Sequence, residues 1–366
     1  MHECSMHGFQ EVILEYFADF LLFFSKTITL LGGIAVLIAL IASASHKSRK
    51  ALKGHLEITQ LNEHYQNLKE ALQHTLMDKH QLKSHIKEGK KQKKEEQKKE
   101  KQKSEKSREK QSNKPRVFIL DFYGDLKASA VKSLREEITA VLSVANPKQD
   151  EVVLRLESGG GMVHSYGLAS SQLQRIRSRH IKLTIAVDKV AASGGYMMAC
   201  TGNRIIAAPF AILGSIGVMA QLPNINRLLK KHEVDIELHT AGEYKRTLTM
   251  LGANTEKGRK KFKQDMEDTH QLFKDFVKNE RKIVDIDKIA TGEVWYGQKA
   301  LEVNLVDDIM TSDEYIYQKV DTVDLIQVRY TLKKGITDKL GLATASAVDS
   351  TLMKCWERLT TSRFFS

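Results

Sequence analysis

The part of the chain after Pro115 alternates short apolar runs with helical stretches, and this alternation limits the possible folds more than any other feature. Helices are expected at residues 129–143 and 166–178. The apolar runs are residues 117–122, 152–156, 183–187, 205–208 and 236–239. Strands separated by helices at this interval pair in parallel through crossover helices. We therefore predict an α/β domain built on a parallel sheet.

The N-terminal part carries a membrane signal. Residues 27–45 are 19 consecutive residues without a charge, which is long enough to span a bilayer. The apolar stretch before them contains Glu15 and Asp19, so it suits an interfacial helix or an extension of the membrane-spanning helix. A cleaved signal peptide would begin with basic residues, whereas residues 1–25 are acidic. We expect an uncleaved single-pass anchor that contacts membrane lipid through this helix.

Lysines and arginines follow the expected span directly, at positions 47, 49, 50 and 53. By the positive-inside bias they favour a cytoplasmic location for the rest of the chain.

The basic surplus lies in one segment. Residues 46–114 hold 20 Lys/Arg against 10 Asp/Glu, in a chain whose net charge is +12. Aromatic side chains are almost absent there, so bases would have nothing to stack on, and we expect no nucleic-acid partner. Leucines at loosely heptad-like gaps predict a short coiled coil in the first half, and the Lys/Glu/Gln-rich second half cannot form a core. We interpret residues 46–115 as a tether.

The cysteines argue against a disulfide framework and against a thiolate zinc site. Cys4, Cys200 and Cys355 are odd in number, far apart and without CxxC spacing. Cys200 is expected to be a small buried hydrophobic residue. We expect neither a metal nor another cofactor.

Two glycine-rich turns each follow an expected strand and open a helix. The first contains Gly159, Gly160 and Gly161. Glycines permit backbone conformations closed to other residues, and their amides form a nest for a phosphate or an oxyanion. A tight packing turn explains the same residues equally well.

The second turn places Ser193 between small residues and a Gly194-Gly195 pair, at a strand-to-helix corner. This is where a nucleophilic serine would be approachable, with the Gly194 amide beside it. A helix N-cap is the alternative explanation of this serine.

A serine nucleophile needs a group that takes its proton. The histidines of this part show no triad context, and a GxSxG elbow is absent. A lysine kept neutral by desolvation would serve. Lys245 and Lys189 are both available, and spacing alone does not choose between them.

Four blocks of the sequence carry a family resemblance. They are AVDKVAASGGYMMAC (186–200), APFAILGSIGV (208–218), LHTAGEYKRTLT (238–249) and TGEVWYGQKALEVNLVDDI (291–309). In this order they closely resemble the signal peptide peptidase A family of membrane serine peptidases, and the single-unit layout with anchor and charged segment is similar to its SohB branch. The resemblance covers residues 116–309 in detail.

The resemblance implies a serine endopeptidase that hydrolyses unfolded or membrane-derived peptides through an acyl-enzyme. Its Ser/Lys dyad matches Ser193 and Lys245, and its oxyanion hole matches Gly160 and Gly194. The family's fold is the ClpP/crotonase-like spiral of ββα units. Its members usually have a proline where this chain has Gly159, which loosens the turn without removing an N–H.

The resemblance also bears on assembly and location. Single-unit relatives form rings, so a homo-oligomer is expected in the bacterial cell inner membrane. Two-unit relatives place the peptidase outside the cytoplasmic membrane, in conflict with the basic flank, so the side stays open. We expect an anchor at 1–45, a peptidase domain at 116–325 and a helical extension at 326–366.

Residues 213–218 are expected to form a strand beside the cleft. Gly214, Ser215 and Ile216 would then pair with the backbone of an extended substrate. An ordinary core strand is the alternative.

Two other functions remain open at this point. An acyl-CoA enzyme on the same spiral would use carboxylates such as Asp188 and Glu157 as acid and base. A non-catalytic membrane scaffold would act through residues 46–114.

Overall fold

The structure is a computed structural model that describes residues 21–29, 31–32, 54–76 and 114–332. It divides into one unit of Met1–Gly54 with Leu332–Ser366 and a second unit of His55–Thr331. In the first unit, residues 21–29 and 31–32 are helical. Among the described residues, no helix combines the length and apolarity that crossing a membrane requires. Residues 33–45 of the expected anchor lie outside the described part, as do 77–113 and 333–366, which include the expected C-terminal helix.

The second unit is built on a largely parallel sheet. Its central strands follow the order β1-β10-β2-β3-β4-β6-β9, and every pair from β10 to β9 is parallel. The strands are β1 (Gly54–Gln60), β2 (Arg116–Gly124), β3 (Glu151–Ser158), β4 (Lys182–Val187), β5 (Val190–Ala192), β6 (Arg204–Ala207), β7 (Ile212–Gly214), β8 (Val294–Tyr296), β9 (Asp308–Ile309) and β10 (Asp324–Leu332). The predicted parallel α/β sheet is confirmed, with strands at four of the five expected apolar runs.

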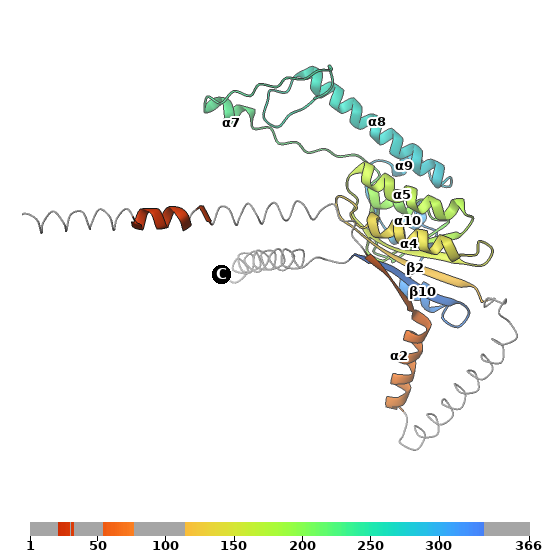
Figure 1. Cartoon of the computed structure of the whole chain (residues 1–366). Helices are drawn as coiled ribbons and strands as arrows, with labels where there is room; N and C mark the ends of the chain where they lie inside the picture. Colours follow the sequence, from red (N-terminus) through yellow and green to blue (C-terminus); the bar gives the residue numbers. More distant parts are fainter. Residues whose placement is uncertain (1–20, 30, 33–53, 77–113, 333–366) are drawn as a thin grey trace, which may run out of the picture. The chain divides into compact units, whose positions relative to one another are not determined.

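The crossover helices lie on one face of the sheet. From β2 to β9 the strand order follows the chain, so right-handed crossovers place every connecting helix on the same side. Helices α4 (Val131–Val144), α5 (Val163–Ser178) and α6 (Gly194–Ala199) bury their apolar side chains there, against residues such as Leu154. Figure 1 shows α4 and α5 on one side of β2 and β10 and α2 on the other. The remaining helices are α2 (Leu61–Leu76), α7 (Asn226–Lys231), α8 (Glu256–Glu280), α9 (Ile286–Ile289), α10 (Gly297–Glu302) and α11 (Ser312–Tyr317).

The opposite face carries a smaller core and holds part of the expected tether. Tyr315 and Ile316 of α11 pack there with Leu61 and Tyr65 of α2. Asn62 ties α2 to the sheet, since its Nδ2 donates to the carbonyl oxygens of residues 320 and 323 at 2.7 and 2.9 Å. Its Oδ1 accepts from the amide of residue 325 at 2.7 Å. Residues 55–76 are therefore part of the sheet's unit, and a strand at 54–60 stands where helix was expected.

Two other expectations about secondary structure are wrong. Residues 236–239 form no strand, because they lie in an arm, defined here as residues 218–255, that leaves the sheet. Ile236 and Leu238 are exposed there, and an apolar run becomes a strand only beside a neighbouring strand. At the other end, residues 326–332 belong to β10 and not to a helical extension.

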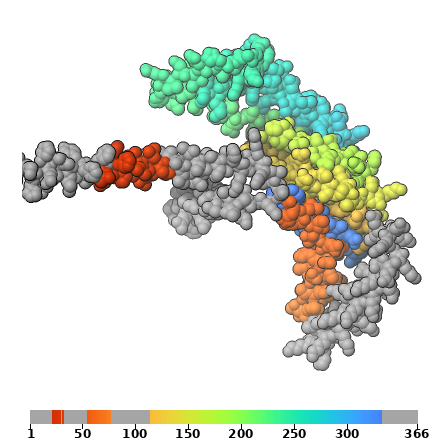
Figure 2. Space-filling model, in the orientation of Figure 1, coloured from red at the N-terminus to blue at the C-terminus, as the bar shows by residue number. Residues whose placement is uncertain are grey.

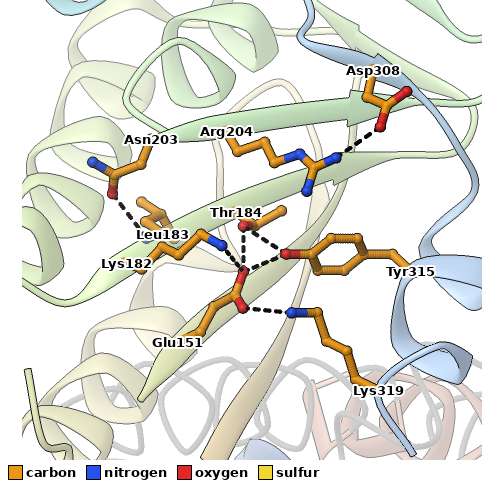
Figure 3. Close-up of polar contacts among 9 residues, drawn as sticks. All are labelled: Glu151, Lys182, Leu183, Thr184, Asn203, Arg204, Asp308, Tyr315 and Lys319. Carbon is orange, nitrogen blue, oxygen red and sulfur yellow. Dashed lines mark hydrogen bonds and ion pairs between the residues drawn. The ribbon is translucent and has the colours of Figure 1, made fainter. Parts of the chain in front are cut away.

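A buried carboxylate joins α11 to the amino ends of two central strands. Glu151 accepts hydrogen bonds from the Thr184 hydroxyl at 2.5 Å and the Tyr315 hydroxyl at 2.6 Å (Figure 3). Its other oxygen accepts from the Lys319 ammonium at 3.0 Å, and Lys182 lies 3.6 Å away. Burial by itself raises the pKa of Glu151, but these hydrogen bonds outweigh burial and hold that pKa below its ordinary value.

A second buried carboxylate has the opposite shift. Glu137 of α4 accepts from the Tyr330 amide of β10 at 2.8 Å, and its Oε2 has no hydrogen-bond partner among the described residues. Burial raises the pKa of Glu137 to about 7, and the hydrogen bond from Tyr330 offsets only part of that effect.

Replacing Glu151 by Gln should lower the free energy of unfolding at pH 7 by about 1–3 kcal/mol, because three donors lose a charged acceptor. Folding lowers the pKa of Glu151. The stability that Glu151 contributes is therefore fully present at a pH above its pKa in the unfolded chain, and it is lost as the pH falls through its pKa in the folded protein. Urea denaturation at pH 7 and pH 4 measures this, with Glu302→Gln as an exposed control. An equal effect of Glu151→Gln at both pH values would contradict the prediction.

Glu137→Gln should act in the opposite direction. Between the ordinary value of 4.5 and the folded value of about 7, the folded protein binds the extra proton, so wild-type stability falls as the pH rises through this window. The neutral amide escapes this loss. The variant should gain up to about 3 kcal/mol relative to wild type between pH 4.5 and pH 8. Thermal melting across this range tests it, with the exposed neighbour Glu136→Gln expected to stay flat.

Candidate active site

Ser193 lies at the corner between β5 and α6 in a backbone conformation that serine rarely adopts. Its φ is 52° and its ψ is −119°. Its amide donates to the Gly214 carbonyl at 2.8 Å, which holds the corner against β7. Ser193 occupies the N-cap position of α6, as the alternative explanation expected, but its side chain makes no capping hydrogen bond. Strained backbone conformations of this kind cluster at functional sites, and the nucleophile elbow is one example.

The first glycine turn packs directly against this serine. Gly160 has φ +89°, and a Cβ placed on it would lie 2.7 Å from both the Gly194 nitrogen and the Ser193 Cβ. Any larger residue would therefore cover the amide next to the serine. The structure brings Gly160, Ser193 and Gly194 together, as the sequence predicted.

The amides of these glycines are not equivalent. Gly194 is the first residue of α6, and its amide has no acceptor among the described residues, as is usual at a helix start. The Gly160 amide donates to the Ser158 hydroxyl at 3.1 Å. Within the same described part, the Gly161 amide has no acceptor.

The segment expected to bind substrate differs from the prediction. β7 ends at Gly214, with φ +87° there and +50° at Ser215, so residues 215–218 do not continue the strand. β7 already pairs with β5 on one side and β8 on the other. The Ser215 amide donates to the Glu293 carbonyl at 2.6 Å, and the His270 imidazole donates to the Ile216 carbonyl at 3.1 Å.

The two candidate lysines are in different situations. Lys189 is exposed and forms an ion pair with Glu157 at 3.2 Å. Lys245 lies in the arm, in a turn closed by the hydrogen bond from its own amide to the Gly242 carbonyl at 3.2 Å. It is exposed, and among the described residues its side chain forms no hydrogen bond or ion pair with Ser193.

The arm itself exposes apolar surface. No residue from 219 to 251 is buried, and Met219, Leu228 and Leu238 are 87%, 55% and 53% exposed. In the space-filling view the arm, coloured green, is not covered by other segments on the face turned to the viewer (Figure 2). Apolar patches of this kind mark interaction surfaces.

Other titratable groups have structural partners. Asp188 accepts from the Ser312 amide at 2.7 Å and the Ser312 hydroxyl at 2.5 Å. Cys200 is fully buried as predicted, and burial raises the pKa of its thiol. Within the described residues, no three His, Cys, Asp or Glu side chains gather as metal ligands would.

Two contacts of this region escape prediction from the sequence: the Tyr166 ring packs against Gly194, and the His270 imidazole donates to the Ile216 carbonyl. Tyr166 and His270 come from α5 and α8, far along the chain from the serine, and neither lies in a recognisable motif. Only the tertiary arrangement places them at the site.

Comparison with known proteins identifies relatives of this chain. The family model described as peptidase family S49 N-terminal matches residues 15–173, and the model described as peptidase family S49 matches residues 175–325. A probable protease SohB of Haemophilus influenzae is 50% identical over 321 residues, covering 87% of this chain and 90% of that protein. A probable protease SohB of Buchnera aphidicola subsp. Schlechtendalia chinensis is 48% identical over 308 residues, covering 84% of this chain and all of that protein.

Among solved structures, a mutant 1510-N membrane-bound stomatin-specific protease in complex with a substrate peptide is 14% identical, with a TM-score of 0.41. The match covers 63% of this chain and 97% of that one. The two family models matched in order, and the half-identical relative of nearly the same length, show that the chain belongs to peptidase family S49.

Proposed function

We propose that this S49 protease is a serine endopeptidase in which Ser193 is the nucleophile and Lys245 the general base. The observation that carries the proposal is the strained backbone of Ser193, whose side chain makes no capping hydrogen bond, next to a Gly194 amide that has no acceptor among the described residues. Such a corner combines an approachable oxygen with a donor for the charge that develops in the transition state.

The reaction follows from these groups. The Ser193 oxygen attacks a peptide carbonyl while the uncharged Lys245 amine takes its proton. The same amine then returns a proton to the leaving nitrogen, and water releases the acyl-enzyme. The Gly194 amide and one amide of the first glycine turn hold the oxyanion. Gly160 is the predicted turn donor, and Gly161 is an alternative because the Gly160 amide already donates to Ser158.

Lys245 reaches a serine through a second copy of the chain. The arm that carries it has no core of its own and exposes apolar side chains along its length. Packing the arm on a neighbouring copy would bury those side chains and desolvate the Lys245 amine, which a neutral base requires. A homo-oligomer thus completes the site.

The substrates are unfolded or membrane-derived peptides, hydrolysed on a ClpP/crotonase-like spiral without a cofactor. Gly214, Ser215 and Ile216 line the site, and an extended substrate pairs with backbone groups that follow Ser215. Residues 27–45 anchor the chain in the bacterial inner membrane through lipid contacts. An acyl-CoA chemistry is disfavoured because Asp188 and Glu157 already pair with Ser312 and Lys189.

Ser193→Ala and Lys245→Ala should each lose several orders of magnitude in peptidase activity, and mixing them should restore part of it. In mixed oligomers, an intact serine of one copy meets an intact lysine of another. Co-expression with two affinity tags, followed by a peptidase assay and fluorophosphonate labelling of Ser193, measures this. Full labelling of Lys245→Ala alone would exclude that lysine as the base. If peptidase activity does not return at any ratio of the two variants, the proposal that a second copy supplies Lys245 is contradicted.

Gly160→Ala should remove most peptidase activity and destabilise the fold, because the new Cβ would fall 2.7 Å from the Gly194 amide nitrogen at a φ of +89°. Gly159→Ala is the matched control, since a Cβ there meets nothing within 4 Å. Activity and melting temperature of both variants test this. Equal losses in the two variants would mean that the turn needs glycines in general and not an open Gly194 amide.

A further inference from the structure

Tyr166 of α5 stands at the centre of a directed chain of hydrogen bonds. Its side chain is fully buried, and its hydroxyl donates to the Asp125 carbonyl at 2.8 Å. The hydroxyl has one proton, so the contact of 2.6 Å with Ser158 must be a hydrogen bond that Ser158 donates. The Ser158 oxygen then accepts from the Gly160 amide at 3.1 Å. The chain runs from Gly160 through Ser158 and Tyr166 to Asp125.

The ring of the same tyrosine supports the other wall of the site. A Cβ added to Gly194 would lie 2.4 Å from the Tyr166 Cγ, so the ring packs directly against the residue that follows the nucleophile. One side chain therefore touches Gly194 with its ring and holds the Gly160 turn with its hydroxyl.

The turn needs such support. Three consecutive glycines, Gly159 to Gly161, have more backbone freedom than any other tripeptide, and no proline restricts them. The hydrogen bond from the Met162 amide to the Leu126 carbonyl, at 2.9 Å, fixes the far end of the turn. Ser158 and Tyr166 fix its near end. Burial raises the pKa of the Tyr166 hydroxyl, so it remains protonated and able to donate at neutral pH.

We propose that Tyr166 is a positioning residue of the proposed peptidase, which sets the distance between the Gly194 amide and the glycine turn and thereby the geometry of the oxyanion hole. The inference rests on the proposed function. It assigns to Tyr166 no contact with substrate, since the side chain is closed off from solvent.

Tyr166→Phe tests the proposal, because it keeps the ring and removes the hydroxyl. Oxyanion-hole donors stabilise the transition state more than the ground state, so kcat should fall about ten- to a hundredfold while KM changes little. Tyr196→Phe is the matched control. Tyr196 is equally buried and donates to the Leu305 carbonyl at 2.8 Å, so its loss costs a similar hydrogen bond elsewhere in the core. Its kcat should stay within about twofold of wild type.

A second measurement does not depend on activity. Hydrogen exchange followed by mass spectrometry should show faster exchange in the 158–164 segment of Tyr166→Phe and unchanged exchange there in Tyr196→Phe. Wild-type exchange in the Tyr166 variant, or equal loss of kcat in both tyrosine variants, would overturn the proposal. If Ser193→Ala still hydrolyses peptides, the proposed nucleophile fails, while the exchange experiment continues to decide whether Tyr166 holds the turn.

Discussion

The hydrogen bond between the Ser193 amide and the Gly214 carbonyl is the constraint around which the site is organised. It holds a serine at a positive φ, and it does so by joining the start of α6 to the last residue of β7. β7 is itself fixed on both sides by β5 and β8. The pairing of β7 therefore offsets the free-energy cost of the strained backbone at Ser193. Strained conformations persist in proteins only where the surrounding structure stabilises them in this way.

Several central elements of the fold could be predicted from local pattern. The runs at 117–122, 152–156, 183–187 and 205–208 contain parallel strands whose residues are mostly buried, and their apolar sequences predict this directly. The two glycine-rich turns could also be located from the sequence, although local pattern alone did not choose between a reactive site and an ordinary turn or helix cap. In each of these cases the local sequence and the tertiary environment favour the same structure.

The remainder depends on contacts that no window of sequence contains. β5 and β8 have three residues each and exist because neighbours pair with them. Residues 236–239 have the right alternation but meet no strand, and residues 54–60 become a strand because β10 offers an edge. In the sequence nothing distinguishes Tyr166 from other aromatic residues, because the contact of its ring with Gly194 is formed only in the folded structure. Lys245 was identified by the family resemblance, yet in the described part of the chain its exposed side chain forms no hydrogen bond with the serine.

The docking of β1 and α2 changes the meaning of the charged segment. The sheet's unit contacts the first turns of α2 through Asn62 and Tyr65, and the chain joins the sheet again at Arg116, where β2 begins. The connection between α2 and β2 therefore starts and ends on the same unit. The entropy of closing such a loop rises only with the logarithm of its length, by roughly 0.6 kcal/mol per doubling. Changes in the length of this connection should therefore cost the sheet's unit little stability.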